Sequence, residues 1–137
     1  MIGLVVATHG PLAAALLETV AGVVGPLERA AAVSVDAHAS VDDARARLGG
    51  AIAEVDAGDG VLVLTDMFGG TPANLALTFL DEKIEVVTGV NLPMLLKLAS
   101  ARAEPLAAAA ELAAAAGQKN ITLASALLRA RAQPARR

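Results

Sequence analysis

The amino-acid sequence predicts one α/β domain with a doubly wound parallel sheet, in the strand order 2-1-3-4, and with helices on both faces. Two observations carry this expectation. Short β-branched apolar runs alternate along the chain with stretches whose apolar residues recur at helical spacing. The length of 137 residues and the apolar share of 55% suit a single domain, and aliphatic side chains must fill its core because aromatic residues are nearly absent.

The first half of the chain is expected to form two strands and two helices. The ranges are a strand at residues 2–7, a helix at 11–24, a weaker strand at 30–36 and a second helix from Ser40 through an apolar stripe to Val55. Ser40, three residues before Asp43, resembles a capping box and marks the start of that helix. Gly49 and Gly50 weaken it by about 1 kcal/mol each relative to alanine, and close packing on the sheet is one explanation.

The second half centres on the stretch from Leu64 to Asn74. A buried strand at residues 61–65 ends at Asp66, two glycines follow, and Thr71 is interpreted as the N-cap of a helix at 72–80 that has Pro72 in its first position. The remaining expected elements are a strand at 84–88, a helix from Asn91 and Pro93 to about residue 101, an alanine-rich helix from Pro105 that Gly117 closes, and a fifth strand or edge at 120–124.

Two polar side chains follow two strands that this order makes neighbours. His9 comes after the first strand and Asp66 after the third. Ligand sites in open α/β sheets lie outside the carboxyl ends of the strands where the direction of winding reverses, which is between these two strands. We therefore expect His9 and Asp66 to lie side by side, with the carboxylate fixing the tautomer of an imidazole that acts as a nucleophile near neutral pH.

The surroundings of His9 favour phosphorus as the atom attacked. Gly10, Gly69 and Gly70 allow the backbone to approach an anion closely, and helix N-termini are expected at both turns. Thr71 is a candidate to donate its hydroxyl to a phosphate oxygen, or simply to cap its helix. On spacing alone, however, one His and one Asp in loops are more often coincidence than catalysis, and Asp after a strand is often only a turn residue.

Several other functions are disfavoured by the composition. The chain has no cysteine and two distant histidines, so we expect no metal and no disulfide. We also expect no cofactor, because the glycine patterns of nucleotide-binding loops are missing. No apolar segment approaches the ~20 residues that span a bilayer, and the start reads as a strand rather than a signal peptide, which favours a cytoplasmic protein.

The charge is unevenly distributed along the chain. The net charge is −3, with 14 acidic and 11 basic residues. Four of the basic residues are Arg129, Arg131, Arg136 and Arg137, so the chain before them carries −7. Such a basic tail can touch an acidic partner or nucleic acid, but it is more often solvated, and we expect no nucleic acid.

Three blocks of sequence resemble a known family. They are Val6-Ala-Thr-His-Gly10, Asp66-Met-Phe-Gly-Gly-Thr-Pro-x-Asn74 and Gly89-Val-Asn-Leu-Pro-Met-Leu95. Together they resemble the enzyme IIA domain of the mannose-type sugar phosphotransferase system, over roughly residues 1–125, with 126–137 as a basic C-terminal tail. The resemblance implies a flavodoxin-like fold and a homodimer in which a C-terminal strand, here 120–124, crosses to the partner.

The resemblance also implies a function. His9 is expected to take a phosphoryl group from phospho-HPr on its ε2 nitrogen, to be supported by Asp66, and to pass the group to a histidine of a separate enzyme IIB. Thr71 is expected to help hold the phosphate. The family often has a tryptophan in the aspartate turn where this chain has Phe68. From their expected places around His9, Met67, Phe68 and Leu12 are candidates for an exposed apolar rim on which partners dock.

Three other interpretations remain open at this point. The same phosphorylatable fold can act as a regulatory module that binds partners according to its phosphorylation state. The phosphotransfer subunit of a dihydroxyacetone kinase is a less favoured candidate, because the turn of those subunits lacks the Gly-Gly-Thr-Pro block found in this chain. A histidine phosphatase is disfavoured because Thr8 stands where those enzymes have arginine. The sequence does not encode the sugar, and contact with a membrane is expected only indirectly, through transporter components.

Overall fold

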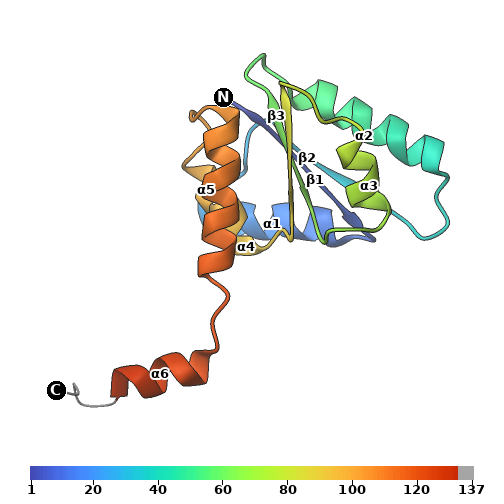
Figure 1. Cartoon of the computed structure of the whole chain (residues 1–137). Coiled ribbons are helices and arrows are strands. Elements are labelled where there is room, and N and C mark those ends of the chain that lie inside the picture. The colour runs from blue at the N-terminus through green and yellow to red at the C-terminus, as the bar shows by residue number, and fades with distance from the viewer. Residues whose placement is uncertain (133–137) are drawn as a thin grey trace.

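The computed structural model describes residues 1–132, which fold into four strands and six helices (Figure 1). In chain order the elements are β1 (Gly3–His9), α1 (Leu12–Val24), β2 (Ala30–Val35), α2 (Val41–Val55), β3 (Val61–Thr65), α3 (Thr71–Leu77), β4 (Ile84–Thr88), α4 (Leu92–Ala99), α5 (Leu106–Lys119) and α6 (Ala124–Ala132). None of these helices is long and apolar enough to cross a membrane.

The four strands form one parallel sheet in the order β2-β1-β3-β4, which confirms the expected topology. Ala7 lies opposite Thr65 in the pairing of β1 with β3, so both strands end at the same edge of the sheet. β1 runs two residues further than expected. Backbone N–H groups beyond residue 7 still find partners, since Gly10 N–H donates to the carbonyl of Val35 in β2.

Helices cover both faces of the sheet and build two separate apolar clusters. On one face α1, α4 and α5 pack on alternate residues of the central strands, among them Val6 and Leu64. On the other face α2 and α3 pack on the intervening residues, among them Val5 and Val63. Because both faces are covered, all five residues of β3 are buried, as its uninterrupted apolar sequence predicts.

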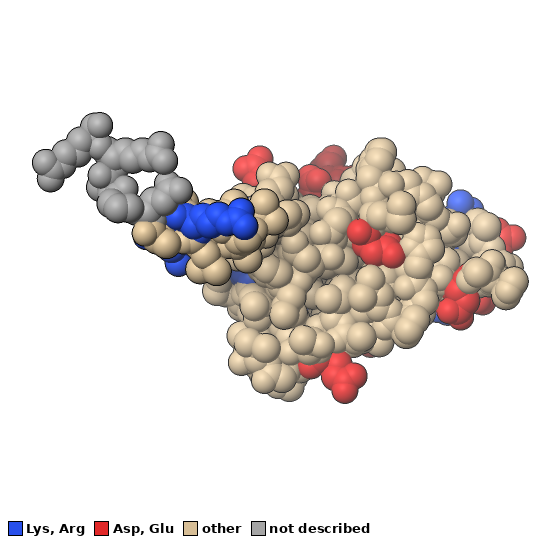
Figure 2. Space-filling model, turned by 90° about the horizontal axis from the view of Figure 1, so that it is seen from below, with Lys and Arg blue, Asp and Glu red and all other residues tan. Residues whose placement is uncertain are grey.

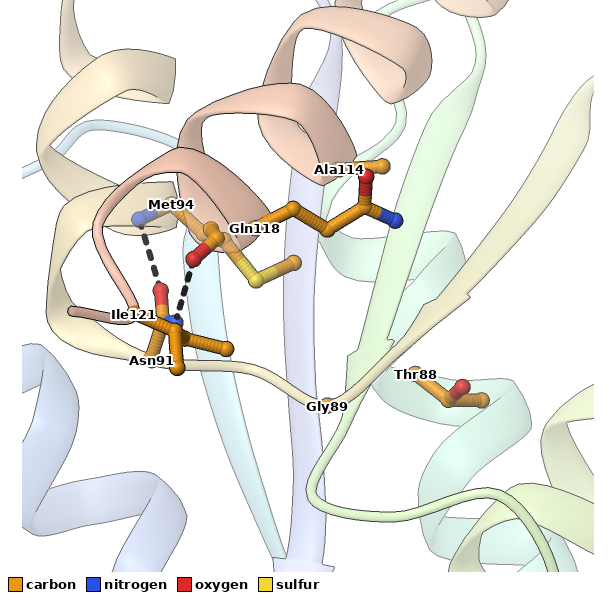
Figure 3. A pocket seen from close by; sticks show the side chains of 8 residues that line it. Thr88, Gly89, Asn91, Met94, Ala114, Gln118 and Ile121 are labelled. Atoms are coloured by element: carbon orange, nitrogen blue, oxygen red, sulfur yellow. Dashed lines mark hydrogen bonds between the residues drawn. The ribbon is translucent and has the colours of Figure 1, made fainter. Parts of the chain in front are cut away.

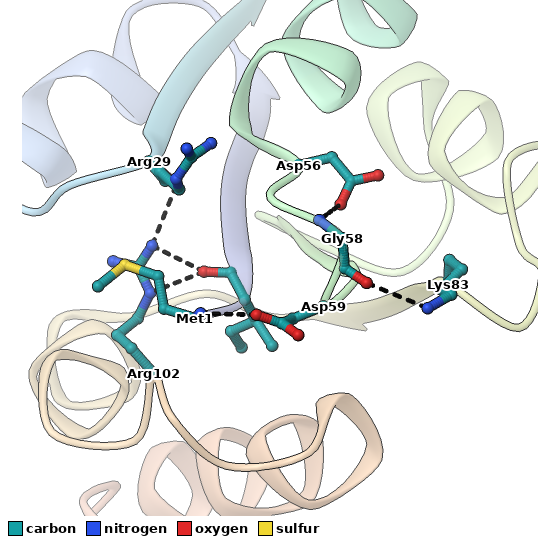
Figure 4. Close-up of polar contacts among 8 residues, drawn as sticks. Met1, Arg29, Asp56, Gly58, Asp59, Lys83 and Arg102 are labelled. Atoms are coloured by element: carbon teal, nitrogen blue, oxygen red, sulfur yellow. Dashed lines mark hydrogen bonds and ion pairs between the residues drawn. The ribbon is translucent and has the colours of Figure 1, made fainter.

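Polar contacts at the amino edge of the sheet tie the ends of several elements together (Figure 4). The guanidinium of the buried Arg102 donates to the carbonyl of Ile2 from Nε and from one terminal nitrogen, at 3.0 and 2.8 Å, and to the carbonyl of Arg29 at 3.2 Å. The amino group of Met1 lies 2.7 Å from Asp59 Oδ2. These contacts hold the edge opposite the carboxyl ends of the strands.

Gly117 does not close α5, contrary to the prediction. The helix continues to Lys119, with Asn120 as its C-cap, and Gly117 is buried inside it. A Cβ atom on Gly117 would stand 2.6 Å from Cγ and 2.8 Å from Sδ of Met94 in α4. Figure 3 shows how closely α4 and α5 approach beside a cavity at the end of β4. The glycine therefore serves helix-to-helix contact rather than termination.

The fifth strand expected at residues 120–124 is also wrong for the described chain. Residues 121–123 belong to no regular element, and α6 begins at Ala124. A strand needs a neighbouring edge to bond to, whereas α6 projects away from the domain and buries none of its residues (Figure 1). The expected tail at 126–137 is thus helical up to Ala132, and its last five residues lie outside the described part. The homodimer stays a prediction.

Candidate functional site

The first feature of the candidate site is the contact between His9 and Asp66. The Nδ1 atom of His9 lies 2.8 Å from Asp66 Oδ2, and the backbone N–H of His9 donates to the same oxygen at 3.1 Å. The two residues stand 57 positions apart, and the pairing of β1 with β3 brings them together. The side chain of His9 is 49% exposed and that of Asp66 only 15%. The expected contact is therefore present, at the surface of the carboxyl edge.

The carboxylate of Asp66 is held in its charged form. Its partial burial opposes ionisation, but hydrogen bonds from the His9 ring, from the His9 backbone and from its own backbone lower the pKa of Asp66 below its ordinary value of 3.8. A carboxylate accepts and does not donate, so the neutral imidazole must carry its proton on Nδ1. The lone pair of Nε2 is then available for chemistry.

The loop between β3 and α3 brings its backbone against the imidazole. Gly69 and Gly70 both adopt positive φ, at +86° and +85°. A Cβ atom on Gly70 would stand 3.0 Å from Cε1 and 3.1 Å from Nε2 of His9, whereas one on Gly69 would meet nothing within 4 Å. Gly10, which follows His9 in the sequence, has φ +55°. Only at Gly70, therefore, would a side chain crowd the His9 ring, and the close approach of these glycines to an anion stays a prediction.

Thr71 is not the N-cap of α3, contrary to the interpretation from its sequence. Gly70 occupies the cap position and makes no side-chain capping bond, and Thr71 is the first helical residue. The positive φ of Gly70 lets the chain turn into the helix one residue earlier than expected. Thr71 is exposed, so its hydroxyl is accessible beside the glycine that touches His9.

Thr8 is a residue of the site that sequence reasoning missed. Its side chain is completely buried, and its hydroxyl accepts the backbone N–H of Ala13 at 2.7 Å. This bond fixes the first turn of α1 against the end of β1, directly beside His9. A hydroxyl residue at the last inward position of a strand, five residues before an amide at a helix start, is the signal that could have found it.

Three apolar side chains that follow His9 or Asp66 closely in the sequence are exposed, as predicted. Leu12 at the start of α1 is 43% exposed, and Met67 and Phe68 in the loop after β3 are 54% and 77% exposed. Figure 2 views the molecule from below, toward the edge at which the strands end, and most of this face carries no charged side chain. His38 shares no hydrogen bond or ion pair with the site within residues 1–132, and no metal-binding cluster occurs there.

A half-exposed imidazole, held by a partly buried carboxylate at the switch point of a parallel sheet, defines a domain suited to nucleophilic group transfer. The family described as "PTS system fructose IIA component" matches residues 3–116. The chain therefore belongs to the enzyme IIA family of the mannose and fructose type, and it is a phosphotransfer component of the phosphoenolpyruvate-dependent sugar phosphotransferase system.

Two curated relatives illustrate the match. The fructose-specific EIIA component of Bacillus subtilis is 32% identical over 104 residues, which cover 74% of this chain and 71% of the relative. The mannose-specific EIIAB component of Escherichia coli K12 is 33% identical over 103 residues. The chain spans only 32% of the length of that longer relative, which is consistent with its matching one part of a two-component protein.

Solved structures confirm the fold. The phosphotransferase system component EIIA from Streptococcus agalactiae has a TM-score of 0.82 at 26% identity, and the alignment covers 92% of this chain and 99% of that one. The mannose/sorbose-specific IIA subunit from Enterococcus faecalis has a TM-score of 0.80 at 32% identity, covering 88% and 92%. The flavodoxin-like order expected from the sequence is thus shown by relatives as well as by the strand pairing.

Proposed function

We propose that this protein carries a phosphoryl group on His9 Nε2, which it accepts from phospho-HPr and passes to a histidine of a separate enzyme IIB. The observation that supports this most is the 2.8 Å contact between His9 Nδ1 and Asp66 Oδ2. It occupies one ring nitrogen and leaves the other for attack. The family supports the general role, since enzyme IIA components work with HPr and enzyme IIB.

The transfer conserves atoms and electrons without any cofactor. The lone pair of His9 Nε2 attacks phosphorus, the N–P bond of the donor breaks, and the donor nitrogen keeps the electron pair of that bond. His9 then carries the phosphoryl group on Nε2 and a proton on Nδ1, so its ring is positively charged. Asp66 stabilises that charge through the bond it already makes. The second transfer reverses these steps toward the acceptor.

Three further groups are proposed to hold the phosphoryl oxygens. Gly69 and Gly70 both have positive φ, and a Cβ added to Gly70 would stand 3.1 Å from Nε2, so this loop lies beside the nitrogen proposed to react. Gly10 follows His9 in the sequence and also has positive φ. Thr71 has an exposed hydroxyl that can donate to an oxygen. The apolar rim of Leu12, Met67 and Phe68 is proposed to receive the partner, and contact there excludes water from the labile N–P bond.

The test is phosphorylation with phosphoenolpyruvate, enzyme I and HPr, followed by intact-mass measurement. The wild type and His38→Ala should each gain one acid-labile phosphoryl group, and His9→Ala should gain none. Addition of a cognate enzyme IIB should then remove the group from the wild type. A phosphoryl group that still appears in His9→Ala would refute the assignment of His9. A phosphorylated protein that passes its phosphoryl group to no enzyme IIB would favour a regulatory module instead.

A further inference from the structure

A hollow between α2 and α3 adjoins the candidate site, and of its lining residues only Thr71 has been given a role so far. Its volume is about 290 Å³. The residues that line it are Val41, Arg45, Thr71, Asn74, Leu75 and Thr78. It shares Thr71 with the site, because Thr71 follows the glycine that touches the His9 ring. The hollow therefore adjoins the surface around His9.

The lining of this hollow favours a negatively charged group. Arg45 is its only charged residue, and the side chains of Thr71 and Asn74 add hydrogen-bond donors. Arg45 takes part in no ion pair or hydrogen bond within residues 1–132. Arg47 on the same helix is different, since it donates to the carbonyl of Ser34 at 2.7 Å and lies 3.5 Å from Asp43.

The size of the hollow limits what can occupy it. Pockets that bury small-molecule ligands usually measure about 300–1,000 Å³, so this one is at or below the lower limit. A single carboxylate side chain that enters from a docked protein suits both the volume and the charge. Such a side chain would meet the guanidinium of Arg45 and the amide of Asn74.

Charge also distinguishes the phosphoryl donor from the acceptor, the two proteins proposed to dock over His9. The chain before Arg129 has a net charge of −7, so it repels a partner that arrives with a phosphoryl group more than one that arrives without it. A local cation at the rim of the site offsets that repulsion where the charged partner docks. Arg45 is placed to do so, because its hollow contains Thr71.

We propose, on the basis of the function proposed above, that the Arg45 hollow receives an acidic side chain of the phosphoryl donor when the donor docks over His9. Arg45 then contributes to recognition of the donor and not to the chemical step. It acts on the affinity for phospho-HPr and on the salt dependence of the encounter, while the rate at saturation depends on His9 and Asp66.

The test compares Arg45→Gln with Arg47→Gln, two variants that lose the same charge from the same helix. We expect Arg45→Gln to raise KM for phospho-HPr about fivefold with kcat unchanged, which is the upper range for one exposed ion pair. Added salt should also lower kcat/KM less, or raise it more, in Arg45→Gln than in the wild type, because one local attraction that salt screens has been removed. Arg47→Gln should change KM less than about twofold. Transfer to enzyme IIB is measured separately, from the phosphorylated protein.

Each outcome bears on the proposal. An equal rise of KM in both variants would show a general effect of net charge and would overturn the role of the hollow. If Arg45→Gln slowed only the transfer to enzyme IIB, the assignment of the hollow to the donor would be overturned. An unchanged KM in Arg45→Gln would overturn the contact itself. The function proposed above is tested independently, because at saturating phospho-HPr all three proteins should still end with one phosphoryl group on His9.

Discussion

Gly70 approaches His9 so closely that a Cβ atom added to the glycine would stand 3.1 Å from Nε2, the nitrogen proposed to react. Replacing Gly70 by alanine should therefore displace the imidazole and slow phosphorylation of His9 about tenfold or more. The positive φ of +85° should also cost about 1–2 kcal/mol of unfolding free energy. Gly89→Ala is the matched control, since its φ is +86°, its Cβ would meet nothing within 4 Å, and it lies outside the candidate site. It should lose similar stability and keep its phosphorylation rate; equal rates in the two variants would refute the steric argument.

Asp66→Asn should slow acceptance of the phosphoryl group by about 10²-fold, because an amide stabilises the positively charged ring less well and can donate to Nδ1, favouring the wrong tautomer. Phosphorylation kinetics would measure the rate, and ¹⁵N NMR of the ring would report the tautomer. Asp59→Asn makes the same chemical change at the opposite edge of the sheet, where Asp59 contacts the amino group of Met1. If both variants react at the wild-type rate, the supporting role of Asp66 is wrong.

The stability of the fold should depend on the ionisation of Asp66. Its pKa is lowered in the folded state, so its contribution is fully present above the unfolded value of about 3.8 and disappears as the pH falls through the lower folded value. The difference in unfolding free energy between the wild type and Asp66→Asn should thus shrink as the pH falls below 3.8. Urea unfolding at a series of pH values measures it. A difference that grows on acidification would contradict the direction of the pKa shift.

Gly117→Ala should destabilise the protein by about 1–3 kcal/mol, because the added Cβ would meet the buried Met94 at 2.6 Å. Gly50→Ala tests the same substitution in α2, where a Cβ meets nothing within 4 Å, and it should stabilise by about 0.5–1 kcal/mol. Thermal unfolding of the two variants gives both signs. A stabilised Gly117→Ala would show that α4 and α5 tolerate a wider separation.

The C-terminal segment should join two copies of the chain. Ile121, Leu127 and Leu128 are 75%, 41% and 63% exposed, and none of the nine residues of α6 is buried. Light scattering should therefore give the mass of a dimer for the full chain and of a monomer for a chain ending at Asn120. A monomeric full chain would remove the expected homodimer, and a dimeric truncated chain would place the interface elsewhere.

Much of this architecture was predictable because local signals and global packing agree. The apolar runs at β3 and β4 gave both strands with their observed ends, and Ser40 caps α2 through the N–H of Asp43 as expected. The meeting of His9 and Asp66 followed from the order of the strands alone.

The errors arose where a residue type has more than one structural use. Glycine is typical of the end of a helix, but Gly117 instead allows close packing against Met94, which depends on where α4 lies. The alternating sequence at 120–124 suits a strand only if a neighbouring edge exists, and α6 follows instead. The Arg45 hollow depends on a contact between two helices that no local pattern reveals, whereas the bond of Thr8 to Ala13 spans five residues and is a local signal that sequence reasoning missed.

The backbone N–H of His9 donates to the carboxylate of Asp66, so this side chain extends the ladder between β1 and β3 by one further bond. The site is consequently built from a non-local contact, whose loop-closure entropy must be overcome before the pocket exists. Partially folded chains in which these two strands are not yet paired cannot be phosphorylated at His9. The amount of phosphoryl group taken up at His9 should therefore be proportional to the fraction of folded protein, and it should be lost in the same cooperative unfolding transition as the sheet.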